Sequence, residues 1–314
     1  MADGDGSEAG PDPDFLREAR EGLAKTPKSL SSKWLYDQRG SELFEQITKL
    51  DEYYPTRTET AILKAYAPEI AAAIGPGAVV VEYGAGAAIK TRLVLDALEA
   101  PEAYAPQDIS EEFLKMAAAT LAADYPNLHV VPLVGNFLEP LDLSGLPNGR
   151  RCGFFPGSTI GNLSDAQIRS FFQLARESLG PDARFLLGFD LRKSPDILVP
   201  AYDDADGVTA MFIVNLLTRM NRELGADFDP DGFVYQAEWN DDLSQIEMSI
   251  RSVRNQSVSI AGQSFDFADG ETLLTSVSRK FTPETLARIV GEAGWTIDQT
   301  WFDERQYFGL ALLA

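Results

Sequence analysis

Residues 78–86 read AVVVEYGAG. A short apolar run that is bounded by glycine is typical of a strand buried in a parallel sheet. The glycines that follow let the backbone pass close to a ligand and leave the amides of the next helix facing it. Because tight turns use glycine for other reasons as well, this stretch predicts a buried strand, and it predicts a ligand-binding turn only together with its neighbours.

The same pattern of strand and helix repeats after this turn. Strands are expected at 103–106, 129–134, 152–156 and 184–190, and helices at 88–98, 111–123 and 164–178. Alternation of this kind predicts a doubly wound α/β domain, in which right-handed crossovers join the strands of a parallel sheet.

The region 191–281 has a different pattern. A helix is expected at 208–224, and alternating polar and apolar residues at 246–251 and 257–260 predict an antiparallel sheet. A capped helix at 282–293 and strands at 295–298 and 307–313 follow. We therefore expect a Rossmann-like domain at 59–192 and 282–314, an inserted α+β subdomain at 14–58 and 193–281, and a disordered tail at 1–13.

The composition excludes several classes of function. Asp and Glu number 48 against 27 Lys and Arg, and the resulting net charge of −21 repels nucleic-acid phosphates and anionic lipid. A single cysteine cannot form an internal disulfide, and a single histidine cannot build a multi-histidine metal site. The sequence contains neither a membrane-spanning apolar run nor an export signal. We therefore expect a cytoplasmic monomer that binds neither metal, membrane nor nucleic acid.

Two further positions indicate which cofactor the turn binds. Asp108 follows the second predicted strand, where a carboxylate can accept both ribose hydroxyls of an adenosine, although a helix cap is an equally plain role for it. Asn136 and Phe137 follow the third strand, where an amide can bind the edge of adenine and a ring can cover its face. The NAD fingerprint requires a third glycine, which Ile89 replaces. The set therefore favours S-adenosylmethionine over a dinucleotide.

Longer motifs give the chain a family resemblance. They read WLYDQRGSELF at 34–44, EYYPTRTE at 52–59, KTR at 90–92, DIS at 108–110, FPGSTIGN at 155–162, GFDL at 188–191 and SRKF at 278–281. In this order they resemble the histidine-specific N-alpha-methyltransferase family of ergothioneine biosynthesis, a family of class I methyltransferases. The resemblance runs from about residue 14 to the C-terminus.

The resemblance implies an activity and a set of site residues. Members transfer three methyl groups from S-adenosylmethionine to the alpha-amino group of L-histidine, giving hercynine. The implied cofactor residues are Gly84, Gly86, Lys90, Asp108, Asn136 and Phe137. The implied substrate residues are Tyr54 or its neighbour Tyr53, Gly157, Asn162, Tyr202, Met248, Ser276 and Ser278, and the implied catalytic residues are Tyr36 and Tyr54.

The chain departs from the family pattern at one position. Many members have a glutamate that binds the imidazole ring where this sequence has Ser276, whereas Ser278 matches the family's serine. A serine hydroxyl can bond to a neutral imidazole but lacks the charge that favours an imidazolium. Tryptophan or tyrosine therefore stays open as the substrate, and so does a non-catalytic protein that binds the cofactor or an amino acid as a regulator.

Several of these residues also have plain structural explanations. Tyr53 and Tyr54, which precede a proline, could pack at a helix junction, and Asn162 could be a turn residue. Met248 could belong to the core, and Lys90 could be solvated. The chemistry itself requires alignment of a neutral amine with an activated methyl group rather than a strong base.

Overall fold

The computed structural model describes residues 11–86 and 89–314, which form two compact units. The large-sheet unit comprises Tyr54–Ser194, Asp242–Gln245 and Ser278–Ala314. The small-sheet unit comprises the described residues up to Tyr53 together with Pro195–Asp241 and Ile246–Val277. Most of the predicted tail, residues 1–10, lies outside the described residues. Whether the units are domains with the predicted boundaries stays a prediction.

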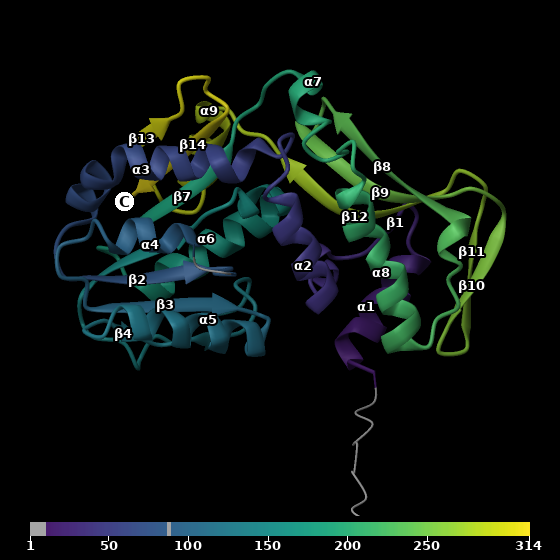
Figure 1. Ribbon diagram of the computed structural model, residues 1–314, viewed down its shortest axis with the longest axis horizontal. Helices are drawn as coiled ribbons and strands as arrows, with labels where there is room; N and C mark the ends of the chain where they lie inside the picture. Colours follow the sequence, from purple (N-terminus) through teal and green to yellow (C-terminus); the bar gives the residue numbers. More distant parts are fainter. Residues whose placement is uncertain (1–10, 87–88) are drawn as a thin grey trace, which may run out of the picture. The chain divides into compact units, whose positions relative to one another are not determined.

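Within the described residues, the large-sheet unit contains an eight-stranded sheet with the order β13-β14-β7-β6-β2-β3-β4, in which β5 also pairs with β3 (Figure 1). The strands are β2 Ala78–Tyr83, β3 Ala103–Asp108, β4 His129–Val130, β5 Leu133–Val134, β6 Arg150–Phe155, β7 Arg184–Asp190, β13 Ile297–Phe302 and β14 Phe308–Leu313. The strands β7, β6, β2, β3, β4 and β5 pair with one another in parallel. β14 pairs with β7 in antiparallel orientation, and β13 pairs with β14 in the same way.

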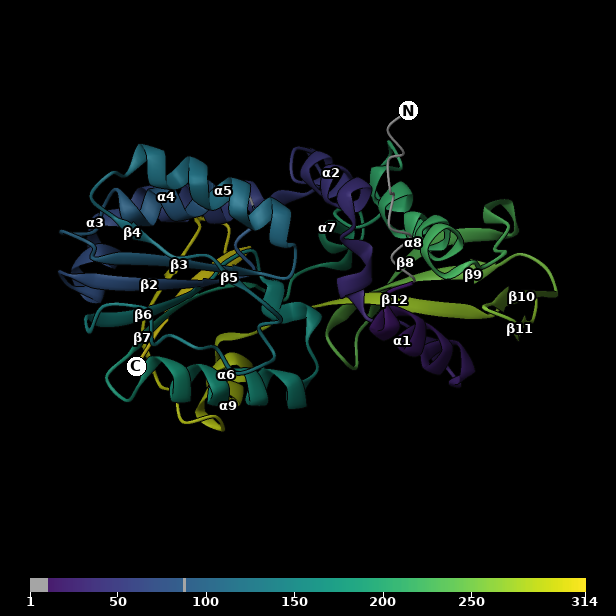
Figure 2. The ribbon, with the colours of Figure 1, turned by 90° about the horizontal axis from the view of Figure 1, so that it is seen from below.

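Helices cover both faces of this sheet. Figure 2 shows α3, α4 and α5 on one face and α6 and α9 on the other. Their bounds are α3 Tyr54–Ile74, α4 Ile89–Leu95, α5 Glu111–Asp124, α6 Asp165–Leu179 and α9 Pro283–Gly291. Two separate apolar cores result, one on each face. This arrangement confirms the predicted doubly wound α/β fold.

Two details of the predicted sheet are wrong. The strand expected at 129–134 is divided into β4 and β5, because Pro132 has no amide hydrogen to continue the ladder. The strand expected from Trp295 begins only at Ile297, since the backbone amide of Trp295 donates to the Val290 carbonyl of the preceding helix at 3.1 Å instead of to a strand.

The small-sheet unit is built around a four-stranded sheet with the order β1-β12-β9-β8, seen to the right in Figure 1. The strands are β1 Lys28–Ser29, β8 Phe233–Asn240, β9 Gln245–Ser252 and β12 Thr272–Arg279, and β10 Gln256–Ile260 and β11 Gln263–Phe267 form a separate antiparallel hairpin. The helices include α1 Pro13–Ala24, α2 Gln38–Ile47, α7 Pro195–Leu198 and α8 Val208–Leu224. The expected single antiparallel sheet is therefore wrong in part: the stretch 246–251 lies in the four-stranded sheet, in which β1 pairs with β12 in parallel, whereas 257–260 lies in the separate hairpin.

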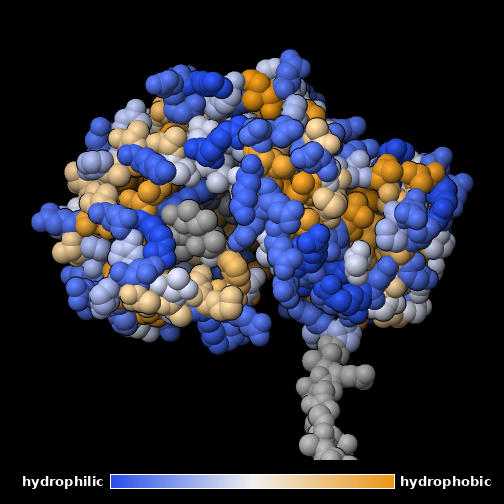
Figure 3. All heavy atoms as spheres, in the orientation of Figure 1, coloured by the Kyte–Doolittle hydropathy of each residue, from blue (hydrophilic) through white to orange (hydrophobic). Residues whose placement is uncertain are grey.

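The face drawn in Figure 3 carries hydrophilic side chains interspersed with hydrophobic ones. No helix in the described ranges combines the length and the apolar character that crossing a bilayer requires.

Candidate active site

The parallel strands of the large-sheet unit end in a row of polar residues. β2 ends with Glu82 and Tyr83, β3 ends with Asp108, and β7 ends with Asp190. The turn after β6 begins at Pro156. Because these strands are parallel, their carboxyl ends lie at one edge of the sheet, where doubly wound folds bind their ligands. We call this row and the turns that follow it the carboxyl edge.

The glycine turn after β2 leaves room for a ligand. Gly84 and Gly86 have φ values of +67° and +49°, which other residues rarely adopt, and a Cβ added at either would meet no atom of the described residues within 4 Å. The Ala85 amide donates to the Gln107 carbonyl at 3.0 Å, so the turn is attached to the end of β3. Its backbone is therefore held close to an open space.

Asp108 joins this turn to the next one. Its Oδ2 accepts a hydrogen bond from the Gly86 amide at 3.3 Å, and its Oδ1 accepts one from the Ser110 amide at 3.0 Å. The Asp108 carbonyl accepts from the Gly135 amide at 3.0 Å, which brings the turn after β5 alongside. Asp108 is therefore a turn residue rather than the predicted helix cap, since Ser110 is the N-cap of α5, and each of its carboxylate oxygens accepts one backbone amide.

The turn after β5 carries Asn136 and Phe137 at this same place. The side-chain oxygen of Asn136 accepts from the Leu138 amide at 3.0 Å, and the half-buried Phe137 ring lies 5.3 Å from the ring of Phe155. Beside them, the buried Oε1 of Gln107 has no hydrogen-bond partner among the described residues. The structure therefore brings together the predicted residues Gly84, Gly86, Asp108, Asn136 and Phe137.

Glu82 is a buried acid that the sequence analysis did not select. Its Oε2 accepts hydrogen bonds from the hydroxyls of Thr91 and Tyr104, so the carboxyl group connects β2, α4 and β3. Burial raises the pKa of Glu82 from 4.5 to about 7, although both hydroxyls oppose this shift. A glutamate in an otherwise apolar strand was the available signal.

Lys90 is not solvated. Its ammonium group forms an ion pair with Glu59 of α3, a carboxylate that is 0% exposed. Both Glu59 oxygens also accept from the Gly157 amide, at 3.0 and 2.9 Å. The first turn of α4 is therefore connected to the turn that follows β6.

A second buried charge cluster surrounds Asp190. The Tyr54 hydroxyl donates to its carboxylate, with distances of 2.9 and 2.8 Å to the two oxygens. The ammonium groups of Lys193 and Lys280 each lie 2.6 Å from one carboxylate oxygen. Burial lowers the pKa of Lys193 from 10.5 to about 8, while Asp190 opposes the shift. The predicted Tyr54 is thus held by Asp190 and Lys193, and Lys280 pairs with the same acid; the sequence analysis selected none of these three.

Three further predicted residues lie near this cluster or on the turn after β6. Ser278 accepts from the Lys280 ammonium at 2.8 Å. Gly157 has a φ of +79°, and Asn162 is half-buried at the end of the short helix η2 Thr159–Asn162. A Cβ on Gly161 would lie 2.8 Å from the Arg279 carbonyl oxygen, which shows that this turn packs closely against the segment after Ser278.

The small-sheet unit collects the remaining predicted residues in two places. Tyr36 and Tyr53 both contact the ring of Phe44, at 5.5 and 6.4 Å between centroids. Tyr53 also lies 5.9 Å from Tyr202. These four residues form what we call the tyrosine cluster.

Met248 and Ser276 lie on the neighbouring strands β9 and β12. The Met248 side chain is buried, as the core explanation expected, and Ser276 is half-buried. The Thr275 hydroxyl donates to the Met248 carbonyl at 2.8 Å. The strand pairing therefore brings the two predicted positions close together.

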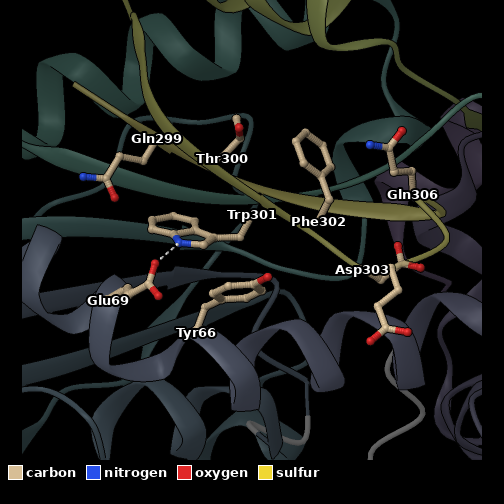
Figure 4. Close-up of a pocket in the computed structure, with 9 residues that line it drawn as sticks. Tyr66, Glu69, Gln299, Thr300, Trp301, Phe302, Asp303 and Gln306 are labelled. Atoms are coloured by element: carbon tan, nitrogen blue, oxygen red, sulfur yellow. Dashed lines mark hydrogen bonds between the residues drawn. The ribbon is translucent and has the colours of Figure 1, made fainter.

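One open surface depression lies away from these residues. It is open, has a volume of about 650 Å³ and lies between α3 and the β13–β14 hairpin (Figure 4). Its lining residues are Tyr66, Glu69, Gln299, Thr300, Trp301, Phe302, Asp303, Glu304 and Gln306. The Trp301 indole donates to Glu69 at 3.2 Å across it. It contains none of the predicted site residues and no group of described residues suited to hold a metal ion.

A doubly wound sheet, a glycine turn after its first strand and an acid at the end of the next strand are the features with which folds of this class bind an adenosine-containing cofactor. The model of the family described as "Histidine-specific methyltransferase, SAM-dependent" matches residues 15–314, and the chain belongs to this family. The family resemblance noted in the sequence is thereby confirmed.

Curated relatives agree with this assignment. The chain is 45% identical to histidine N-alpha-methyltransferase of Mycolicibacterium smegmatis, with 94% of this chain and 93% of that protein covered. It is 42% identical to the protein of the same name from Mycobacterium tuberculosis, with 95% and 94% covered. It is 35% identical to ergothioneine biosynthesis protein 1 of Neurospora crassa, where 63% of this chain matches 23% of the longer protein.

The residues of the carboxyl edge fit S-adenosylmethionine. The space above Gly84 and Gly86 can take the cofactor's chain, and Asp108 can accept its ribose hydroxyls. The buried Gln107 oxygen, which has no hydrogen-bond partner among the described residues, is a further acceptor beside the turn that carries Asn136 and Phe137.

The buried Glu82 makes stability depend on pH. Its pKa in the folded protein, about 7, lies above the ordinary 4.5, so the folded state holds a proton that the unfolded chain releases between these values. The stabilisation of the folded state by this proton is fully present below pH 4.5 and is lost as the pH rises through 7. Glu82→Gln is neutral at every pH, and its stability relative to the parent should therefore rise by up to ~3 kcal/mol between about pH 5 and 8.

Urea unfolding of both proteins at the two pH values measures this difference. Glu112→Gln, on the exposed surface of α5, is the matched control and should show no pH-dependent difference from the parent. An equal effect of Glu82→Gln at both pH values would contradict the assignment of a neutral, buried Glu82.

Proposed function

We propose that this protein transfers methyl groups from S-adenosylmethionine to the alpha-amino group of L-histidine, three in succession, giving hercynine for ergothioneine biosynthesis. The observation that carries the proposal is the family match over residues 15–314, which includes both the carboxyl edge and the substrate residues. The two mycobacterial relatives bear the name of this activity and match along nearly their whole length.

Binding of the cofactor is assigned to the carboxyl edge. Asp108 would hold the ribose hydroxyls, Asn136 and Phe137 the adenine, and the Gly84–Gly86 turn with Lys90 the amino-acid portion. When bound, the cofactor supplies a methyl group that is already activated on a sulfonium. The enzyme's task is therefore to present a neutral amine in line with that group, and positioning of this kind can lower a barrier by about 7–11 kcal/mol in ideal cases.

The buried Asp190 cluster supports a role for Tyr54 in handling the amine. Its hydroxyl is fixed by Asp190 and lies 2.7 Å from the Lys193 ammonium, so it is held in a defined orientation. A free alpha-ammonium must lose its proton before each transfer. A fixed phenol beside a lysine whose pKa is lowered to about 8 by burial can orient the nitrogen and pass that proton on.

The proposed substrate residues are Tyr53, Tyr202, Met248, Gly157, Asn162 and Ser278, and Tyr36 is proposed to be catalytic together with Tyr54. Asn162, Tyr53 or Tyr54, and Tyr202 would bind the amino and carboxylate groups. Ser276 would lie toward the imidazole and bond to its neutral form. We further propose that the protein acts as a cytoplasmic monomer, in keeping with its single, buried Cys152 and its acidic surface.

An experiment with competing amino acids tests the function. We expect mass spectrometry of reactions with S-adenosylmethionine and equimolar histidine, tryptophan, tyrosine and phenylalanine to show three added methyl groups on histidine alone. Reactions without protein serve as the control. Methylation of tryptophan or tyrosine would overturn the substrate assignment, and cofactor binding without any methylated product would indicate the regulatory alternative.

The identity of residue 276 should affect histidine binding through charge. Ser276→Glu adds the carboxylate that many family members have, and charge-assisted hydrogen bonds are about twice as strong as neutral ones, so KM for histidine should fall roughly tenfold. The control is Ser276→Gln, which has the same length without the charge and should leave KM within about twofold of the parent value. Steady-state kinetics that give the same change for both variants would show that charge at this position plays no part.

A further inference from the structure

Glu59 is a buried carboxylate to which the sequence analysis gave no role. It lies in the second turn of α3, is 0% exposed and accepts from the Gly157 amide at 3.0 and 2.9 Å. It also forms the ion pair with Lys90, whose side chain is only 17% exposed. One side chain thus contacts the start of α4 and the turn after β6.

The neighbouring backbone leaves space for this carboxylate. A Cβ on Gly188 of β7 would lie 2.0 Å from Glu59 Oε1, a distance at which the two atoms cannot coexist. A Cβ on Gly157 would lie 3.6 Å from the Lys90 Nζ, and its φ of +79° favours glycine in any case. Gly188 therefore leaves the room that the Glu59 carboxylate occupies, and the Gly157 amide and Lys90 hold the carboxylate there.

The two segments joined by Glu59 have different proposed ligands. Lys90 follows the glycine turn, which is assigned to the cofactor, and it also lowers the pKa of the buried Glu82. Gly157 begins the turn that ends at Asn162, which is assigned to the amino acid. Within the large-sheet unit, Glu59 is thus the hydrogen-bonded connection between a cofactor segment and a substrate segment.

We propose that Glu59 is a positioning residue that couples cofactor binding to amino-acid binding, an inference that rests on the proposed function. A ligand that fixes Lys90 also fixes the carboxylate, which in turn holds the Gly157 amide in place for the second ligand. Because the ordering is then partly complete, the second ligand binds more tightly. Coupling of this kind is reciprocal, so each ligand increases the affinity of the other by the same factor.

Calorimetry with S-adenosylhomocysteine and L-histidine tests the proposal without turnover. In the parent protein, saturating histidine should lower the Kd of S-adenosylhomocysteine at least fivefold, within the usual range of such coupling. Glu59→Gln keeps an oxygen that can accept from the Gly157 amide but loses the ion pair with Lys90, so the connection is broken and the ratio of the two Kd values should fall to within twofold of one. A residue that served only stability would change the melting temperature and leave this ratio intact.

Glu69→Gln is the matched control, because Glu69 lies on the same helix and bonds to Trp301 instead. Its ratio should equal that of the parent. If Glu59→Gln does not fold, Lys90→Met removes the other half of the ion pair. This variant should also bring the ratio of the two Kd values close to one, whatever it does to the affinity for S-adenosylhomocysteine or for histidine alone. A parent ratio near one, or an unchanged ratio in the folded variants, overturns the inference, whereas a parent that binds neither ligand overturns the proposed function with it.

Discussion

Three fully buried carboxylates at the carboxyl edge, those of Glu59, Glu82 and Asp190, impose the main constraint on this structure. A buried charge costs several kcal/mol unless it is paired and hydrogen-bonded. Each of these acids therefore draws donors from other elements of the large-sheet unit. Glu82 accepts hydrogen bonds from hydroxyl groups of α4 and β3. Glu59 pairs with a lysine and accepts from a backbone amide. Asp190 accepts from a tyrosine and pairs with two lysines.

These pairings determine where the candidate site residues lie. α3 supplies both Tyr54 and Glu59 from its first two turns, so one helix contacts the ends of β6 and β7 and the start of α4. Lys193 lies among the carboxylates of Asp190 and Asp303, the ammonium of Lys280 and the rings of Tyr54 and Tyr307. A methyltransferase that needs alignment more than a strong base benefits from such fixed polar groups.

Much of the fold could be predicted from the sequence, because hydrophobic periodicity reports directly which faces are buried. The apolar run at 78–83 and its successors predicted the doubly wound sheet, whereas Pro132 interrupted a strand that periodicity alone would continue. The residues around the cofactor turn could also be selected, since strand ends meet at one edge. Asp190 is the last residue of its strand, as Asp108 is of its own. This shared position was the signal in the sequence that could have selected Asp190 as a site residue.

Other residues of the site had no such signal. Glu59 belongs to a helical stretch in which a glutamate ordinarily faces solvent, and its burial depends on Gly188, which lies far along the chain. Lys193 and Lys280 likewise meet Asp190 only through the tertiary fold. Sequence reasoning identifies residue types at strand ends, but the pairing of buried charges from distant segments requires the structure.

The central claim is that the carboxyl edge binds the cofactor through Asp108. The most direct measurement is the affinity for S-adenosylhomocysteine of Asp108→Asn, which keeps an oxygen for the Ser110 amide but loses the charge. Because a hydrogen bond to a charged group is worth about 1.5–3 kcal/mol, the account predicts a loss of affinity of roughly 10-fold to 100-fold. Asp142→Asn alters a similar turn, in which Asp142 accepts from the Ser144 amide at 2.9 Å, and should change nothing. Equal affinities in both variants and the parent would contradict the account.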